Sequence, residues 1–233
     1  MNTETYKRTQ ELIEKYTSFI KLVQAKNIDE TITINDLLNL KSVLSNINNI
    51  LTLLATLAIA KKLTSIFSFS IDQKKKLLSD IENKKANSNG FDIQIDIPKK
   101  ILVEVKCNIP LTGQKLGQAQ INGILEDARK LRMESFRHRK IKIDTSEYIK
   151  IIGIVNSNPE IFDKILYQIT KEVKCKDTTN LERQERLKVK PFIHPVSSLS
   201  ELTSITNLNN VYIVPISINE LEYELQSIKD NIS

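Results

Sequence analysis

The first third of the chain carries its apolar residues at helical spacing. They recur every three or four positions in residues 1–26, which predicts an amphipathic helix. A longer helix is expected over 36–63 and a third over 71–85. Apolar residues cover most of the surface of the 36–63 helix, so we expect it to be buried, either in the core or at a subunit interface. Its heptad-like seam consists of Leu40, Leu44, Ile47, Leu51, Leu54 and Ala58.

The pattern changes to strict alternation after the turn-forming stretch at 86–90. Isoleucines alternate with polar residues over 90–97, Pro98 begins a turn, and 101–107 is apolar, which predicts a β-hairpin. The nearly continuous apolar run 148–155 is typical of a central strand covered on both faces. The remaining expected elements are helices over 115–136, 159–173 and 219–228, an irregular segment over 175–210, and a strand over 211–218.

This order of elements predicts an α/β fold. We expect a mixed central sheet of four or five strands with helices on both faces, in which 90–97, 101–107 and 148–155 are adjacent. Residues 1–70 form an N-terminal helical region for dimerisation or DNA contact, and 71–233 form the main domain with a C-terminal strand–helix extension. One compact domain over the whole chain is the alternative.

Composition narrows the classes of function. The 233 residues are 40% apolar, which is enough for a sizeable core. The longest apolar run, Ile50–Ala60, is shorter than the roughly 20 residues of a membrane span. The charged N-terminus does not resemble a signal peptide, so we expect a cytoplasmic protein. Two Cys and two His support neither a disulfide framework nor a four-ligand zinc site, so carboxylates and lysines are the expected catalytic groups.

The net charge of +6 is concentrated in one block. Residues 129–142 contain seven basic residues and one acid, so this stretch carries the whole excess. A local basic block is typical of a surface that meets a polyanion, although a solvated charged loop has the same composition. The candidate DNA-phosphate contacts are Arg129, Lys130, Arg132, Arg137, Arg139, Lys140 and Lys142.

The hairpin carries the candidate chemistry. Glu104 and Lys106 lie two residues apart on an apolar strand, so they share one face. Asp92 lies on the neighbouring strand and can approach Glu104 if the chain turns at Pro98; Asp96 is the alternative acid. Two carboxylates suit a hard cation such as Mg²⁺, with the backbone carbonyl of Val105 completing the protein ligands. A lysine beside them can stabilise charge on a phosphate, which indicates phosphodiester hydrolysis.

This arrangement resembles the PD-(D/E)xK nuclease superfamily. Glu104, Val105 and Lys106 match its E-x-K element, and Asp92 matches its metal-binding Asp, with Phe91 in place of the nominal Pro. The resemblance covers about residues 71–156 and implies a restriction-endonuclease-like core. It also implies Mg²⁺, with Mn²⁺ as a substitute. Two further candidates follow from the family pattern: Gln120 on the helix after E-x-K, and Glu82, with Asp80 behind it, as the first-helix acid.

The function expected from the resemblance is a type II restriction endonuclease cutting double-stranded DNA. The chain contains no phosphate-binding G-x-x-x-x-G-K-[ST] loop, so no nucleotide cofactor is expected. Enzymes of this type commonly act as homodimers, because two sites are needed to cut both strands. The alternatives are a repair, recombination or phage-defence nuclease acting by structure or with a partner, and a catalytically idle DNA-binding protein of the same fold.

Overall fold

The computed structural model describes residues 34–84, 90–107, 115–133, 143–171 and 186–232, together with residues 10, 11, 14, 17, 18, 21 and 184. The helix expected over 1–26 therefore falls mostly outside the described residues. The elements in chain order are α2 (Ile34–Ile66), α3 (Ile71–Asn83), β1 (Ile93–Ile95), β2 (Ile101–Lys106), α4 (Gln118–Met133), β3 (Ile149–Asn156), α5 (Pro159–Thr170), η2 (Lys190–Phe192), β4 (Ile193–Pro195), η3 (Leu199–Ser204), β5 (Val211–Ser217) and α7 (Ile218–Ile232).

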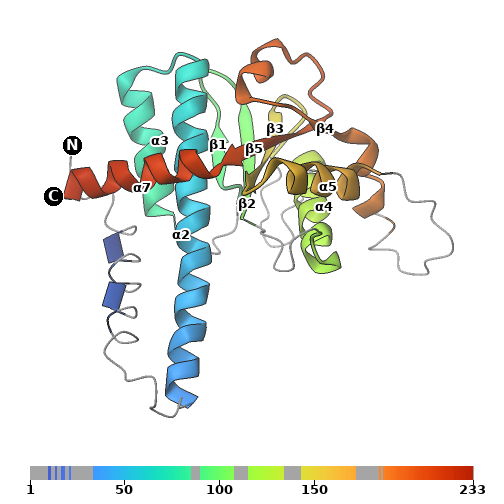
Figure 1. The fold of residues 1–233 in the computed structure, drawn as a ribbon. Coiled ribbons are helices and arrows are strands. Elements are labelled where there is room, and N and C mark those ends of the chain that lie inside the picture. The colour runs from blue at the N-terminus through green and yellow to red at the C-terminus, as the bar shows by residue number, and fades with distance from the viewer. Residues whose placement is uncertain are drawn as a thin grey trace.

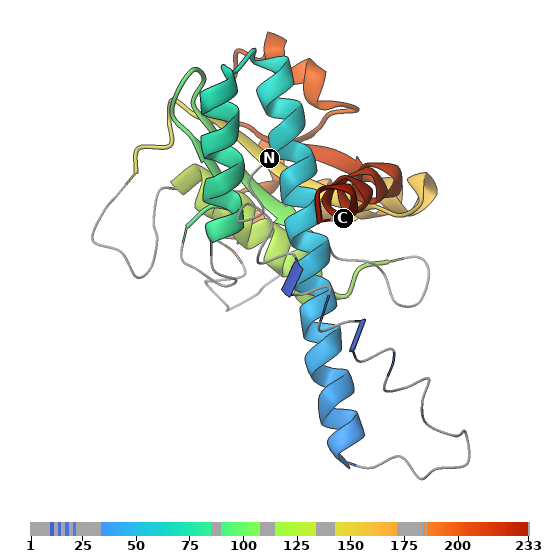
Figure 2. The same ribbon diagram turned by 90° about the vertical axis from the view of Figure 1, so that its left-hand side faces the viewer.

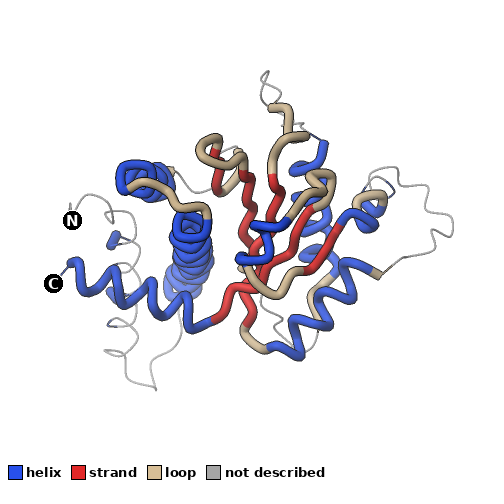
Figure 3. Tube along the Cα trace, turned by 90° about the horizontal axis from the view of Figure 1, so that it is seen from above, coloured by secondary structure: helices blue, strands red, loops and turns tan. Residues whose placement is uncertain are grey.

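A five-stranded mixed sheet forms the centre, in the order β1-β2-β3-β5-β4. β1 pairs antiparallel with β2, and the other neighbours are parallel. The strands expected over 90–97, 101–107 and 148–155 are therefore adjacent in one sheet, and the predicted α/β class is confirmed. Figure 3 shows the sheet between two groups of helices.

Each face of the sheet has its own hydrophobic core. α2, α3 and α7 cover one face, where Ile101, Val103 and Val105 of β2 point. α4 and α5 cover the other face (Figure 1). Leu102 of β2 belongs to the core on that face. The alternation along β2 thus places Glu104 and Lys106 on the face covered by α4.

The long helix α2 belongs to the core in its second half. Residues 53–60 are all buried, and Leu63 is fully buried in the same cluster. The first half projects beyond the other elements (Figure 2), and Ile34 and Leu38 there are 72% and 57% exposed. Within the described residues, one helical segment, Ile47–Ile66, is long and apolar enough to cross a membrane, but 56% of its most apolar window is buried inside the protein. Burial of this extent is typical of a helix that lies in a protein core.

A glycine allows α2 to approach the sheet closely. A Cβ atom on Gly153 of β3 would lie 2.2 Å from Cδ1 of Ile59 on α2 and 2.9 Å from Cδ1 of Ile216 on β5. Such distances are below van der Waals contact, so any larger residue displaces its neighbours. Gly153 therefore lets helix and sheet pack tightly in the middle of an otherwise bulky strand.

The expected hairpin is present as β1–β2, between α3 and α4. One local expectation differs from the structure. The segment expected to be irregular over 175–210 contains the short edge strand β4 and the 3-10 helices η2 and η3. These elements have only three to six residues, too few to produce a readable hydrophobic period.

Candidate active site

The β1–β2 hairpin places Asp92 next to Glu104. Ile93 pairs with Val103, so Asp92, one residue earlier, lies opposite Glu104 at the end of the ladder. Asp92 Oδ2 accepts a hydrogen bond from the Val105 N–H at 2.7 Å. Because the N–H and C=O of one strand residue point to the same side, the Val105 carbonyl also opens toward this edge. Two carboxyl groups and one backbone carbonyl therefore meet where the hairpin opens.

Burial raises the pKa of both carboxyl groups, and neighbouring negative charges add to the effect. Glu104 is 7% exposed, and its burial, followed by the charges of Asp92 and Asp127, holds its pKa well above the ordinary value. Lys130 and Lys106 act in the opposite direction. Burial also raises the pKa of Asp92, against the hydrogen bond from Val105. Neighbouring buried carboxyls of this kind are costly to ionise together without a cation.

A third carboxylate, Asp127 of α4, completes the cluster. It is 3% exposed; its Oδ1 lies 2.9 Å from Lys130 Nζ, and its Oδ2 forms an ion pair with Lys106. Sequence reasoning missed this residue. The available signal was its position seven residues after Gln120, about two turns along the same side of the helix.

Lys84, at the C-terminal end of α3, is a further group that the sequence did not single out. Its Nζ donates to the carbonyl of Phe91, and its charge acts to lower the pKa of Asp92. Glu82, two residues earlier, is buried at 4% exposure. The first-helix role of Glu82 stays a prediction, while Asp80 is exposed on α3.

Gln120 has a structural role at the start of α4. Its Oε1 accepts from the N–H of Gly117 at 2.9 Å, which satisfies one of the unpaired N–H groups at the helix start. That bond fixes the side chain beside the backbone of α4. Participation of Gln120 in catalysis therefore stays a prediction without support from a described contact to the cluster.

Asp96 lies at the opposite end of the hairpin from Asp92. It is exposed, and its Oδ1 accepts from the hydroxyl of Tyr148. The ladder from Ile93 to Ile95 separates the two acids. Asp92, and not Asp96, is therefore the acid beside Glu104.

The described part of the basic block makes contacts within the protein. Arg129 pairs with Glu126, with Nη2 and Oε1 2.6 Å apart, and Lys130 pairs with Asp127. Arg132 Nε donates to the carbonyl of Asn209 at 2.9 Å, and its guanidinium lies 3.4 Å from the centre of the Phe192 ring. Four further candidates lie outside the described residues, so their DNA contacts stay predictions: Arg137, Arg139, Lys140 and Lys142.

The groups that could bind a metal ion in this cluster are few. Over the described ranges, no three His, Cys, Asp or Glu side chains are arranged to hold a metal ion together. A cation site here therefore depends on Asp92, Glu104 and the Val105 carbonyl. Glu104 Oε1 fits such a site, because it is buried and has no hydrogen-bond partner in the part of the chain that the structure describes. Oxygen donors of this kind are those that Mg²⁺ prefers.

Comparison with protein families, curated proteins and solved structures gave no match. The functional argument therefore rests on the residues of this chain.

Proposed function

We propose that the protein is a Mg²⁺-dependent DNA endonuclease of the type II restriction class. The observation that carries the proposal is the pair of neighbouring carboxyl groups, Asp92 and Glu104, with Lys106 on the same face of β2 as Glu104. The raised pKa of both carboxyls and the unsatisfied Oε1 of Glu104 support a cation between them.

Asp92, Glu104 and the Val105 carbonyl are the groups that would hold Mg²⁺. When bound, Mg²⁺ supplies Lewis-acid polarisation of a phosphate oxygen and lowers the pKa of a bound water, and Mn²⁺ can supply the same chemistry. The protein contributes the fixed geometry: the Val105 N–H holds Asp92 in place, and β2 holds Glu104 beside it. Asp92 immediately precedes β1 and Glu104 lies in β2, so the ladder between these strands keeps the spacing of the two acids.

Lys106 provides the positive charge that faces the substrate. Its ammonium can donate hydrogen bonds to a phosphoryl oxygen as negative charge develops there. Asp127 anchors this ammonium from α4 and is itself held by Lys130. Asp127 is therefore a positioning residue, because its contacts run through Lys106 and not to the reacting atoms.

The remaining parts of the proposal concern the substrate and the assembly. Double-stranded DNA is the proposed substrate, because the whole net positive charge falls in residues 129–142, a stretch that begins in the last turns of α4. A homodimer supplies the second site that a double-strand cut needs, and the projecting half of α2 with exposed Ile34 and Leu38 is the proposed contact. We place the enzyme in the cytoplasm, where its DNA substrate is reached.

One observation favours a second candidate, a catalytically idle DNA-binding protein. The ion pairs of Asp127 with Lys106 and Lys130 balance part of the negative charge of the cluster without a metal ion. In an idle protein the same cluster would serve only to connect α4 to β2.

Incubation of supercoiled plasmid DNA with the purified protein tests the proposal. Discrete linear fragments in Mg²⁺, and none in EDTA, are the expected result. A smear that requires Mg²⁺ would indicate a nuclease without sequence specificity. Intact DNA in both Mg²⁺ and Mn²⁺, together with a mobility shift on binding, would reject the nuclease and support the idle DNA-binding protein.

A further inference from the structure

The side chain of Asp127 joins two lysines that come from different elements. Its Oδ2 forms an ion pair with Lys106 of β2. Its Oδ1 lies 2.9 Å from Nζ of Lys130, which follows about one turn later on α4. Charge-assisted hydrogen bonds are short, so two ammonium groups that bind the two oxygens of one carboxylate lie close together. They can therefore meet oxygens of one and the same anion.

Both lysine side chains are open to solvent, while the carboxylate between them is not. The side chains of Lys106 and Lys130 are 26% and 40% exposed, whereas that of Asp127 is 5% exposed. A ligand that arrives from solvent therefore meets the ammonium groups before it meets the carboxylate. An ammonium carries three N–H donors, and the bond to Asp127 uses one of them in each lysine.

Lys130 also acts on the acids of the hairpin. Burial raises the pKa of Glu104, and among the charges that act in the opposite direction Lys130 precedes Lys106. Burial lowers the pKa of Lys130, but the charges of Asp127 and Glu104 raise it above its ordinary value. Lys130 is thus a member of the carboxylate cluster and not only a residue of the outer surface of α4.

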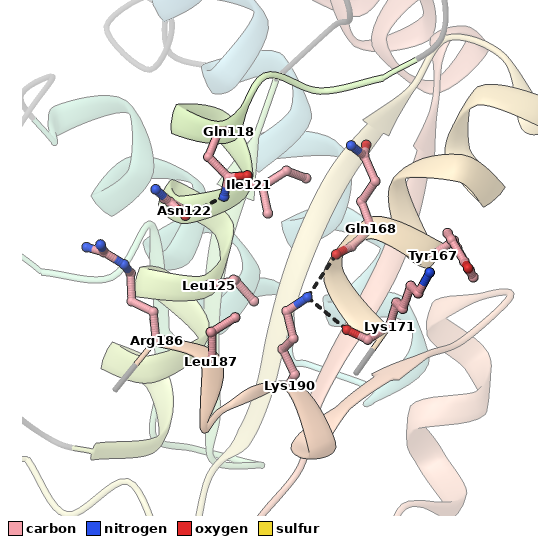
Figure 4. Close-up of a pocket in the computed structure, with 10 residues that line it drawn as sticks. All are labelled: Gln118, Ile121, Asn122, Leu125, Tyr167, Gln168, Lys171, Arg186, Leu187 and Lys190. Carbon is pink, nitrogen blue, oxygen red and sulfur yellow. Dashed lines mark hydrogen bonds between the residues drawn. The ribbon is translucent and has the colours of Figure 1, made fainter. Parts of the chain in front are cut away.

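The hollow between α4 and α5 lies on another side of α4 (Figure 4). Gln118, Asn122 and Leu125 line this hollow at spacings of four and three, so they share one side of the helix. Asp127 follows Leu125 by two residues, which places it on roughly the opposite side. The two lysines that Asp127 joins therefore belong to the carboxylate cluster and are separate from the hollow.

The charges of the cluster suit a phosphodiester when a divalent cation is bound. Such a cation between Asp92 and Glu104 balances those two carboxylates. Asp127 balances one of the two ammonium groups, Lys106 or Lys130. One positive charge is left, and a phosphodiester carries one negative charge.

Two further charged groups act on the cluster, and neither makes it negative. Lys84 adds positive charge, which acts to lower the pKa of Asp92. Glu126 acts on Lys130, but it is paired with Arg129 through two hydrogen bonds. The surroundings of the two lysines therefore favour an anionic ligand.

We propose that Lys106 and Lys130 together bind one phosphate group, each through its own hydrogen bond, while Asp127 holds both ammonium groups in place. This role of Lys130 rests on the proposed function for the identity of the ligand, a phosphodiester. Lys130 is then a contact to the reacting phosphate and not one of several general contacts along residues 129–142. During cleavage, the second ammonium stabilises negative charge that develops on the phosphoryl oxygens.

Binding of the dinucleotide dTpdT, which carries a single phosphodiester, tests the proposal without cleavage. The titration follows the phosphorus NMR signal of dTpdT in Ca²⁺, a hard cation that takes oxygen ligands as Mg²⁺ does. The signal should shift when the wild-type protein is added. Absence of binding at millimolar concentration would overturn the proposal. Competition by thymidine, which has no phosphate, would assign the binding to the base and would overturn it as well.

Methionine variants locate the phosphate, because Met keeps an unbranched apolar side chain but has no ammonium group. Lys106→Met and Lys130→Met should each weaken dTpdT binding about tenfold, the equivalent of about 1.4 kcal/mol. Lys130→Arg, which keeps the charge and the donors, should retain most of the affinity. The matched control is Lys164→Met, which removes an exposed charge on α5 and should leave dTpdT binding unchanged. Wild-type affinity in Lys130→Met would contradict the assignment.

A double variant separates contact with the phosphate from a merely structural role of Lys130. In a protein that already carries Asp127→Asn, the further change Lys130→Met should again weaken dTpdT binding about tenfold. No further loss in that background would make Lys130 a partner of Asp127 alone and would overturn the proposal.

Single-turnover cleavage of plasmid DNA distinguishes this proposal from the nuclease proposal. Lys130→Met should lower the rate at saturating protein at least about tenfold, because the lost contact is to the reacting phosphate. A general DNA contact would change the affinity and its salt dependence but not this rate, and that result would overturn the proposal. Intact plasmid in Mg²⁺ and Mn²⁺, with dTpdT still bound through both lysines, would reject the nuclease and support the phosphate site.

Discussion

Replacing Glu104 by Gln is expected to stabilise the protein when no divalent cation is bound. Burial and two neighbouring acids raise the pKa of Glu104, so the ionised form is costly in the folded state. Gln has nearly the same shape and carries no charge. The substitution leaves a polar group at this place but removes its charge, and a buried charged group without its partners costs at least about 1–3 kcal/mol, which sets the expected gain in unfolding free energy. For a chain of this size that corresponds to a rise in melting temperature of roughly 2–12 °C.

The pH dependence follows from the direction of the pKa shift. A carboxyl whose folded pKa is raised binds its proton more tightly in the folded state than in the unfolded state. Its favourable contribution is complete below the unfolded pKa and is lost as the pH rises through the folded pKa. The difference between Glu104→Gln and the wild type should therefore be small below about pH 4 and grow toward alkaline pH.

Thermal and urea unfolding in EDTA, at several pH values, provide the measurement. The matched control is Glu147→Gln, because Glu147 is an exposed acid that forms an ion pair with Lys100 on the surface. That control should change the unfolding free energy by less than about 0.5 kcal/mol. A Glu104→Gln variant that is less stable than the wild type at pH 8 would show that Lys106 and Lys130 already compensate the ionised carboxylate, and would refute the reasoning.

The other predictions concern packing and substrate contacts. Asp127→Asn should lower the cleavage rate about 10–100-fold in single-turnover assays, because Lys106 loses its anchor, and should leave Mn²⁺ affinity by calorimetry nearly unchanged; a selective loss of Mn²⁺ binding would make Asp127 a ligand instead. Gly153→Ala should reduce the unfolding free energy by about 1–3 kcal/mol in urea titrations, and an unchanged value would mean that Ile59 moves aside without cost. Triple alanine replacement in the basic block should weaken binding to specific and random DNA alike and reduce the slope of log affinity against log salt by about two to three units, whereas an unchanged slope would place the DNA elsewhere. The three replaced residues are Arg137, Arg139 and Lys140.

The sequence predicted the larger elements because they have clear periods. The run 148–155 and the alternation after Gly90 correspond to β3 and β1, and the boundaries of α3 agree within two residues. The strand β4 escaped prediction because it is a three-residue edge strand that contains Pro195. Its pairing with β5 is a tertiary contact that no local pattern encodes.

The candidate site was predictable only where strand geometry determines it. Alternation places Glu104 and Lys106 on one face, and the hairpin register brings Asp92 across from them. The position of Asp127 depends on how α4 crosses the sheet, which the sequence does not specify. The sequence likewise did not show that Arg129 and Lys130 form ion pairs with acids on their own helix.

The sequence also could not decide whether α2 lies in the core or at a subunit interface. Its apolar pattern fits both a core helix and a subunit interface, and the structure buries the second half while the first half projects. Periodicity reports that a surface is apolar, but the partner that covers it is set by the rest of the fold.

Plasmid cleavage by the wild type and two matched variants tests the central claim most directly. The account predicts Mg²⁺-dependent cleavage by the wild type and by Asp96→Asn, which keeps an acceptor for Tyr148 at the far end of the hairpin. Glu104→Gln should cleave at least about 100-fold more slowly while it binds DNA as the wild type does. Cleavage by Glu104→Gln at the wild-type rate would contradict the assignment of this cluster as the active site.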